Sequence, residues 1–468
     1  MVVTMGTTAT AYLTGFGRYL PGDPVDNEGI AARLGGDDPV TERIRRRILE
    51  ANGIRQRHYA LDEHGEPTEL NEELAVKALR AAFDDRGIDA SDVRMLACAT
   101  TMGDVLVPGF ASMVHGRLGG DDPVTERIRR RILESNGIRQ RHYALDEHGE
   151  PTELNEELAV KALRAAFDDR GIDASDVRML ACATTMGDVL VPGFASMVHG
   201  RLGGGPMQLL SASGVCASSL AALDAAVSKI RLGDHPRAAV VGSELASRSL
   251  RQRRFDGIRA GMDSHFLRWM LSDGAGAVVV EFQPHPSRPS LRVDWVRQVS
   301  LAHEHDVCMR SGMSGAEPSV GRTWQDVDIA EAEAAGMFVL RQDVSMLDDL
   351  AEAGLRQFEE LVDIGLIDVQ HLDHVVCHYS TNVFRDLAFE GLRRRIPTLD
   401  TDRWFSNLET CGNTGSASIF IALEEAWRSG RFAPGETILL AVPESGRFSY
   451  AFAHLTVVDP PNRHGAVT

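Results

Sequence analysis

The chain has 468 residues and a net charge of −18 at neutral pH, and 43% of its residues are apolar. This length suffices for two or three ordinary domains, and the acidic charge disfavours nonspecific binding to nucleic acid or anionic membranes. No apolar run approaches the ~20 residues of a membrane span, and six cysteines without a disulfide-like spacing are typical of a reducing compartment. We therefore expect a cytoplasmic globular protein with no nucleic-acid and no membrane partner.

The first predicted strand is 11–21, which runs into a Pro-Gly turn. A tandem repeat follows, in which residues 33–116 recur as 117–200 with one difference in 84 positions, Ala51 against Ser135. Functional repeats drift, so this near identity indicates a recent duplication or an error in the gene, and two copies are too few for a solenoid. We therefore treat one copy as surplus and leave open which copy takes the native place.

The sequences of the two repeat copies predict the same local elements. Copy two has a basic helical segment at 125–133, a turn at 136–142, an amphipathic helix at 158–167 and a buried strand at 179–185. The matching segments of copy one are 41–49, 52–58, 74–83 and 95–101.

Strands and helices alternate in the remainder of the chain. The predicted strands are 207–212, 237–244, 274–281, 374–378, 437–442 and 448–458, and the predicted helices include 346–362 and 417–427. The alternation starts again at Leu291, after a crossing at 284–289, which indicates a layered α/β protein built from two similar halves. We expect an N-terminal half at 1–285 that contains both repeat copies, and a C-terminal half at 286–468.

The stretch from Ser211 to Ala226 predicts a strand end, a tight turn and a largely buried helix with Cys216 at its start. A cysteine there lies on unpaired backbone N–H groups and the positive end of the helix dipole. Both favour the thiolate, which is the form that attacks acyl groups. From this stretch alone, a small buried core cysteine is an equally good interpretation.

Two other segments carry candidate site residues. An apolar strand ends on His378, at a sheet edge where ligands of α/β folds bind, and a turn of small residues places Asn413 just before a buried helix. Each of these alone is more often structural than functional.

Taken in chain order, these sites resemble the thiolase superfamily, and specifically its β-ketoacyl-acyl-carrier-protein synthase III branch. The resemblance covers nearly the whole chain apart from one repeat copy. Its motifs are Gly-Ile-Arg-Gln-Arg-His (53–58 and 137–142), Ala-Thr-Thr (99–101 and 183–185), the Cys216 segment, Val-Val-Gly-Ser-Glu (240–244), Ser-Asp-Gly-Ala-Gly-Ala (272–277) and Gly-Asn-Thr-Gly-Ser-Ala-Ser (412–418).

The resemblance implies a five-layered αβαβα fold, a homodimer and an acyl-carrier-protein partner. Cys216 would take an acyl group from a thioester, and His378 and Asn413 would stabilise the enolate that forms when a malonyl thioester loses carbon dioxide. The N–H of Cys216 and an N–H near Gly446 would hold the acyl oxyanion. No cofactor would be bound permanently, and acyl-CoA or a phosphopantetheinyl carrier protein would be the substrate.

Departures from the family pattern bear on the substrate. A tryptophan common in acetyl-CoA-using relatives is replaced by Arg47 or Arg131, which disfavours a CoA donor, and the residues after His378 and around Gly446 differ too. These changes favour a branch of secondary metabolism, such as polyketide biosynthesis, over housekeeping fatty-acid initiation. Some such relatives transfer acyl groups to oxygen or nitrogen without condensation.

An arginine-rich segment at 248–268 could dock an acidic carrier protein or a phosphate, although it could equally balance the chain's own acidity. The same segment is where the resemblance places substrate residues; the candidates are Arg253, Arg254, Phe255, Phe266 and Trp269. Histidines 303 and 305 with Cys308 match no standard metal spacing, so we expect no metal site. We predict decarboxylative condensation through an acyl-Cys216 intermediate, with acyl transfer to a hydroxyl or amine as the first alternative and a non-catalytic scaffold as the second.

Overall fold

The computed structural model describes residues 18, 25–26, 56–62, 67–69, 71–88, 131–133, 135–146, 150–251, 254–255, 258, 262–268, 270–315, 318–319, 321–397, 399–400 and 403–461. The predicted segments 41–49 and 95–101, and nearly all of 11–21, lie outside these residues. The chain divides into two compact units, of which one comprises 1–105 with 313–332 and the other 106–312 with 333–468.

The described residues of the first unit form few regular elements. Strand β1 (Val25–Asp26) pairs antiparallel with β2 (Gln56–Arg57), and helix α3 (Asn71–Arg86) follows. Helix α9 (Ile329–Ala334) begins in this unit.

The second unit contains two sheets with the same strand order. In the first sheet the order is β4 (Gln208–Ser213), β3 (Met179–Thr184), β5 (Arg237–Glu244) and β6 (Gly274–Glu281). In the second it is β11 (Trp404–Phe405), β10 (His374–Cys377), β12 (Thr437–Glu444), β13 (Ser449–Val458) and β7 (Ser290–Ser300).

The pairing directions confirm the two similar halves. In each sheet the first three strands are parallel and the fourth is antiparallel to the third. The second sheet continues with β7 paired antiparallel to β13, whereas β6 is the edge strand of the first sheet among the described residues. A short pair, β8 (Met309–Arg310) with β9 (Arg341–Gln342), lies outside both sheets.

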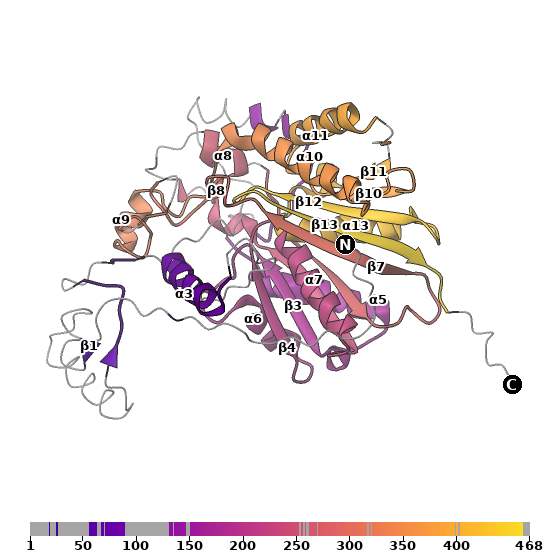
Figure 1. Ribbon diagram of the computed structural model, residues 1–468, viewed down its shortest axis with the longest axis horizontal. Coiled ribbons are helices and arrows are strands. Elements are labelled where there is room, and N and C mark those ends of the chain that lie inside the picture. Colours follow the sequence, from indigo (N-terminus) through magenta and orange to yellow (C-terminus); the bar gives the residue numbers. More distant parts are fainter. Residues whose placement is uncertain are drawn as a thin grey trace. The chain divides into compact units, whose positions relative to one another are not determined.

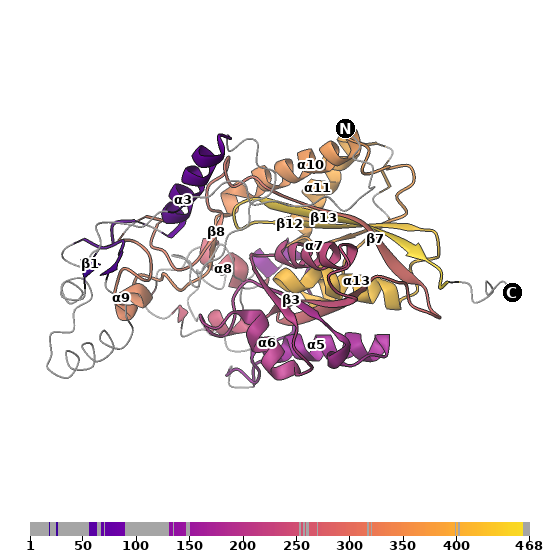
Figure 2. The same ribbon diagram turned by 60° about the horizontal axis from the view of Figure 1, so that its bottom comes forward.

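Helices complete the five layers, which are easiest to follow in Figure 2. Helices α7 (Ser218–Arg231) and α13 (Ser418–Arg428) lie between the two sheets, α5 (Asn155–Arg170) and α6 (Phe194–Leu202) cover the outer face of the first, and α10 (Leu347–Asp363) and α11 (Asn382–Arg395) cover the second (Figures 1 and 2). The shorter helices are α8 (Met262–Arg268) and α12 (Leu408–Cys411). This αβαβα arrangement confirms the predicted fold class.

The second repeat copy supplies the core of the first sheet. Its strand β3 is buried along its whole length between β4 and β5, and α5 buries an apolar face against β5 and β6. Helix α3, in the first copy, has the same sequence as α5, yet Val76 is 43% exposed while its counterpart Val160 is 5% exposed. One apolar stripe therefore packs in a core and the other does not.

Removal of residues 33–116 is expected to leave a folded chain of 384 residues with its Cys216 chemistry intact. The reason is that the second copy already supplies α5, β3 and α6. Removal of 117–200 gives the same chain except for alanine in place of Ser135. Thermal unfolding and acyl-transfer assays of both deletions check this expectation, and loss of soluble, active protein in both would contradict it.

Candidate active site

Three side chains from separate elements meet at one site. Cys216 lies in the turn between β4 and α7, His378 directly follows β10, and Asn413 lies between α12 and α13. All three are buried, with exposures of 7%, 5% and 3% respectively. The N–H of His378 donates to the carbonyl of Ala441 at 3.0 Å, which continues the pairing of β10 with β12 and fixes the backbone there.

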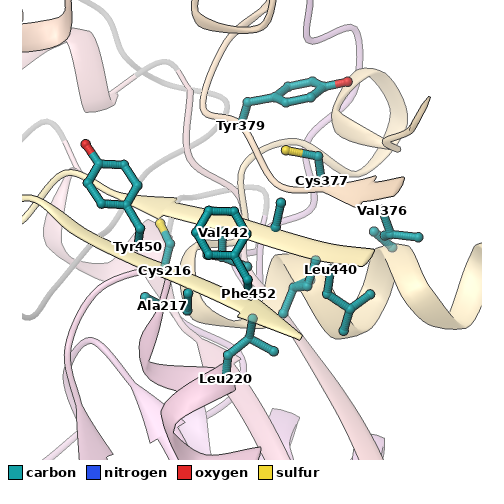
Figure 3. Packing of buried hydrophobic residues seen from close by; sticks show 14 of the residues in the cluster. Cys216, Ala217, Leu220, Val376, Cys377, Tyr379, Leu440, Val442, Tyr450 and Phe452 are labelled. Atoms are coloured by element: carbon teal, nitrogen blue, oxygen red, sulfur yellow. The ribbon is translucent and has the colours of Figure 1, made fainter. Parts of the chain in front are cut away.

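These residues line a single narrow pocket. Its other lining residues are mostly apolar and come from both halves: Val215, Leu267, Met270, Leu271, Met309, Gln342, Leu350, Ser380, Phe384, Gly415, Pro443 and Ser445. Cys216 and Leu220 also belong to the same apolar cluster as Val442, Tyr450 and Phe452 (Figure 3). The nucleophile candidate therefore stands in an apolar wall with a few polar groups beside it, as is usual for small-molecule sites.

The amide of Asn413 is oriented by the backbone. The backbone N–H of Asn413 donates to the Met270 carbonyl at 3.3 Å, and the backbone carbonyl of Asn413 accepts the N–H of Ser272 at 2.8 Å. The side-chain Oδ1 accepts the N–H of Gly415 at 3.0 Å. This fixes Oδ1 as the acceptor, so Nδ2 is the amide atom that can donate a hydrogen bond to a ligand.

Glu244 joins three of the sequence motifs. Its Oε1 accepts the backbone N–H groups of Thr185 and Ser416, at 3.0 and 3.1 Å. Glycine is required at position 242, because a Cβ there would lie 2.5 Å from the carbonyl oxygen of Ser416. The Ala-Thr-Thr, Gly-Ser-Glu and Asn-Thr-Gly-Ser motifs thus hold the Asn413 loop against the sheet.

A second network anchors the turn at 137–142 from the second repeat copy. The N–H of His142 donates to Ser272 Oγ at 2.8 Å, and the N–H of Asp273 donates to the His142 carbonyl at 2.7 Å. The Asp273 carboxylate in turn accepts the N–H groups of Ser247 and Ala144, at 2.6 and 2.7 Å. The motif residues 137–142 and 272–273 thus support the wall that carries Leu271.

Burial shifts the pKa values of both His378 and Cys216. Burial lowers the pKa of His378 to about 4, so its imidazole is neutral at physiological pH. Burial raises the pKa of the Cys216 thiol well above its usual value, and the negative charges of Glu444 and Glu244 raise it further. The backbone hydrogen bond at Cys216 lowers the pKa of its thiol, as the helix N-terminus predicts, but burial and the two carboxylates outweigh it. These directions favour a neutral thiol beside a neutral imidazole.

Glu444 is a site residue that the sequence analysis missed. It ends β12, and its Oε2 accepts the N–H of Ala217, the residue after Cys216, at 3.0 Å. Burial raises the pKa of Glu444 to about 7. The contact joins residues 227 apart in the chain, so no local pattern predicts it. The one indication in the sequence is that Glu444 lies in the Pro-Glu-Ser-Gly segment, which differs from the family pattern.

The loop after Glu444 contributes Ser445 to the pocket. Gly446 follows directly, and its carbonyl accepts the N–H groups of Cys308 and Met309 at 3.1 and 3.2 Å. The predicted oxyanion role of a Gly446 N–H stays a prediction.

The predicted substrate residues lie away from the pocket wall or outside the described residues. Arg253 and Trp269 are not described. Arg254 pairs with Glu333 at 2.9 Å, Phe255 is buried beneath the guanidinium of Arg268, and Phe266 packs against the core. Their neighbours Leu267, Met270 and Leu271 line the pocket instead.

Three described arginines of this segment, Arg248, Arg251 and Arg254, have acidic partners within the chain. Arg248 pairs with Asp188, and Arg251 with Glu150 at 2.5 Å. This favours the interpretation that they balance the chain's own acidity.

Two kinds of feature are absent from the part of the chain that the structure describes. No group of three or more His, Cys, Asp or Glu side chains there is placed to hold a metal ion. No helix among the same residues combines the length and apolar character that crossing a bilayer requires.

Comparison with known proteins agrees with this geometry. Residues 165–283 match the family model of the β-ketoacyl synthase N-terminal domain, and residues 366–452 match that of the 3-oxoacyl-[acyl-carrier-protein] synthase III C-terminal domain. The first match contains Cys216 and the second contains both His378 and Asn413. These matches and the shared fold support a synthase III-like protein of the thiolase superfamily.

The alignments with individual relatives span most of the length of each relative. The β-ketoacyl-[acyl-carrier-protein] synthase III of Bordetella petrii is 27% identical over 351 residues, which is 73% of this chain and 94% of that protein. Among solved thiolase-fold structures, the tetronic acid condensing enzyme AbyA1 is 21% identical with a TM-score of 0.55, covering 70% of this chain and 93% of its own. The priming β-ketosynthase of the R1128 polyketide pathway is 23% identical with a TM-score of 0.54, covering 71% and 89%.

Proposed function

We propose that this synthase III-like protein is an acyltransferase that carries out a decarboxylative condensation through an acyl-Cys216 intermediate. The observation that carries the proposal is the gathering of Cys216, His378 and Asn413 on the wall of one pocket. A nucleophile paired with two neutral hydrogen-bond donors suits a reaction in which negative charge develops on a thioester oxygen.

In the first step the Cys216 sulfur attacks the carbonyl carbon of an acyl thioester. A carbon–sulfur bond to Cys216 forms, the bond to the donor's sulfur breaks, and the proton of the Cys216 thiol ends on the departing thiol. The neutral imidazole of His378, in the same pocket, is a group that can relay this proton.

In the second step a malonyl-type thioester loses carbon dioxide. The electron pair of the breaking carbon–carbon bond forms an enolate, whose oxygen accepts hydrogen bonds from His378 and from Nδ2 of Asn413. The enolate carbon then attacks the acyl carbonyl, a new carbon–carbon bond forms, and the Cys216 sulfur leaves as a thiolate that takes a proton from solvent. Donors already in place in a dry site lower the barrier because they need no reorganisation.

Incubation with an acyl thioester and malonyl-carrier protein tests the proposal. Condensation predicts one carbon dioxide released per β-ketoacyl product. Acyl transfer to a hydroxyl or amine acceptor without carbon dioxide would favour the alternative reaction, and absence of both products from folded protein would favour the scaffold. Acyl-CoA and acyl-carrier donors are compared in parallel, because the exposed Arg131 stands where acetyl-CoA-using relatives have tryptophan.

We further propose that the protein is a homodimer in which two copies of β4 pair. In the described residues β4 is an edge strand, and Leu209 on it is 37% exposed. Val189, Leu190 and Val191, in the loop that follows β3, are 44–56% exposed. An open edge beside exposed apolar residues favours pairing with another strand.

Leu209→Glu is expected to convert the dimer into a monomer, because two like charges would face each other across the new strand pair. Light scattering measures the mass. Leu232→Glu is the matched control, since Leu232 is 59% exposed beyond the end of α7. A monomeric wild type, or a dimeric Leu209→Glu variant, would contradict the interface.

A further inference from the structure

Glu444 brings a carboxylate from the C-terminal half to the start of helix α7 in the N-terminal half. Its Oε2 lies 3.0 Å from the N–H of Ala217, which is the N-cap residue of α7. The same oxygen lies 3.7 Å from where a Cβ on Gly214 would be, so the carboxylate rests against the turn that holds Cys216. The N-terminal end of a helix favours an anion. Here the Glu444 carboxylate takes that place and accepts a hydrogen bond from the N–H of Ala217.

The other titratable groups around this turn offer no compensating positive charge. Among the described residues these are Glu244, at the end of β5, and His378, after β10. Glu244 is itself a buried carboxyl, and burial keeps the His378 imidazole neutral by lowering its pKa to about 4. Ionised Glu444 therefore places a negative charge next to the nucleophile without a cation to offset it.

We propose that the charge of Glu444 governs the reactivity of Cys216: the ionised carboxylate holds the thiol protonated, and the neutral carboxyl permits the thiolate to form. Glu444 acts through Cys216 and is therefore a positioning residue in this scheme. The inference deepens the proposed function, because it matters for catalysis only if Cys216 accepts the acyl group. Its test measures the thiol itself and needs no acyl donor, so the two proposals fail separately.

The pH dependence has a definite sign. Burial raises the pKa of Glu444 to about 7, whereas the pKa of the thiol is raised well above 9. As the pH rises, Glu444 becomes negative before Cys216 loses its proton. Like charges disfavour each other's ionisation, so the Cys216 thiolate forms at a higher pH than it would beside a neutral residue.

The test is the rate of Cys216 alkylation by iodoacetamide between pH 6 and 10, followed by intact-protein mass spectrometry. Glu444→Gln keeps an acceptor for the Ala217 N–H and removes the charge. We expect its alkylation profile to shift by about one pH unit to lower pH, which is roughly ten-fold faster alkylation at a fixed pH below the midpoint. Glu444→Asp, which keeps the charge, should retain a profile close to that of the wild type. Cys216→Ala identifies the labelled residue.

Superimposable profiles of folded wild type and Glu444→Gln would overturn the proposal. Slower alkylation of Glu444→Gln would also overturn it, because the carboxylate would then be accepting the thiol proton. If Glu444→Gln does not fold, the wild type still provides a test with one cationic and one anionic methanethiosulfonate reagent. The ratio of cationic to anionic labelling rates must rise as the pH passes through 7, and a constant ratio would overturn the proposal.

Discussion

Cys216→Ala is expected to abolish product formation from any acyl thioester, with a loss of roughly 10⁴-fold or more, because the covalent step has no substitute nucleophile. The other described cysteines of the second unit do not line the pocket: these are Cys182, Cys308, Cys377 and Cys411. The measurement is the rate of β-ketoacyl product formation under saturating donor and malonyl-carrier protein.

The matched control for this loss is Cys377→Ala. Cys377 is also a buried free cysteine, and it is adjacent to His378, but it ends β10 outside the pocket wall. It should retain most of the activity and differ from the wild type mainly in stability. Residual activity of Cys216→Ala near the wild-type level, or an equal loss in Cys377→Ala, would remove Cys216 from its proposed role.

His378→Ala is expected to slow decarboxylation of the malonyl thioester by about 10²–10³-fold, because one of two donors to the enolate oxygen is lost. Acylation of Cys216 should fall less than decarboxylation, since in that step His378 only relays a proton and its neutral imidazole holds no thiolate in place before reaction. The measurement compares two rates in one preparation: carbon dioxide release and acylation of the protein.

His378→Asn keeps a neutral donor and should recover part of the lost decarboxylation rate. The loss in both variants should be independent of pH between 6 and 8, because burial places the pKa of His378 at about 4, below this range. Equal losses in acylation and decarboxylation would instead assign His378 to the activation of Cys216.

Much of the fold was predictable because its signals are local. The strand predicted at 274–281 is β6 without change, and the helix predicted at 417–427 is α13 (Ser418–Arg428). Helix α10, predicted at 346–362, is followed closely by Gly365, which has a φ of +73°, a conformation in which glycine has no steric cost. Apolar runs and glycine stops are properties of consecutive residues, so one sequence suffices to locate them.

The residues of the site could be predicted from the sequence, whereas the pKa shifts of these residues could not. Cys216, His378 and Asn413 each follow from a local turn and the family resemblance, and the structure brings them to one pocket. The effects of Glu444 and Glu244 on Cys216 depend on contacts between distant segments. A local argument from the helix N-terminus could not weigh burial and two carboxylates against the dipole.

The sequence also could not tell which repeat copy packs in the core. Helices α3 and α5 have identical sequences, so no local property distinguishes them. Strand β3 pairs with both β4 and β5, and the strand of one copy is enough to fill that place. The second copy fills this place in the structure, and the sequence alone left this choice open.

Transfer of an acyl group to Cys216 can be detected by intact-protein mass spectrometry, because the bond to the sulfur is covalent. Wild type and Cys216→Ala are incubated side by side with acyl-CoA and acyl-carrier thioesters of different chain lengths. A mass increase equal to one acyl group is expected in the wild type only, with at least one donor. The absence of an adduct from every donor on folded wild-type protein, or an equal adduct on Cys216→Ala, would contradict it.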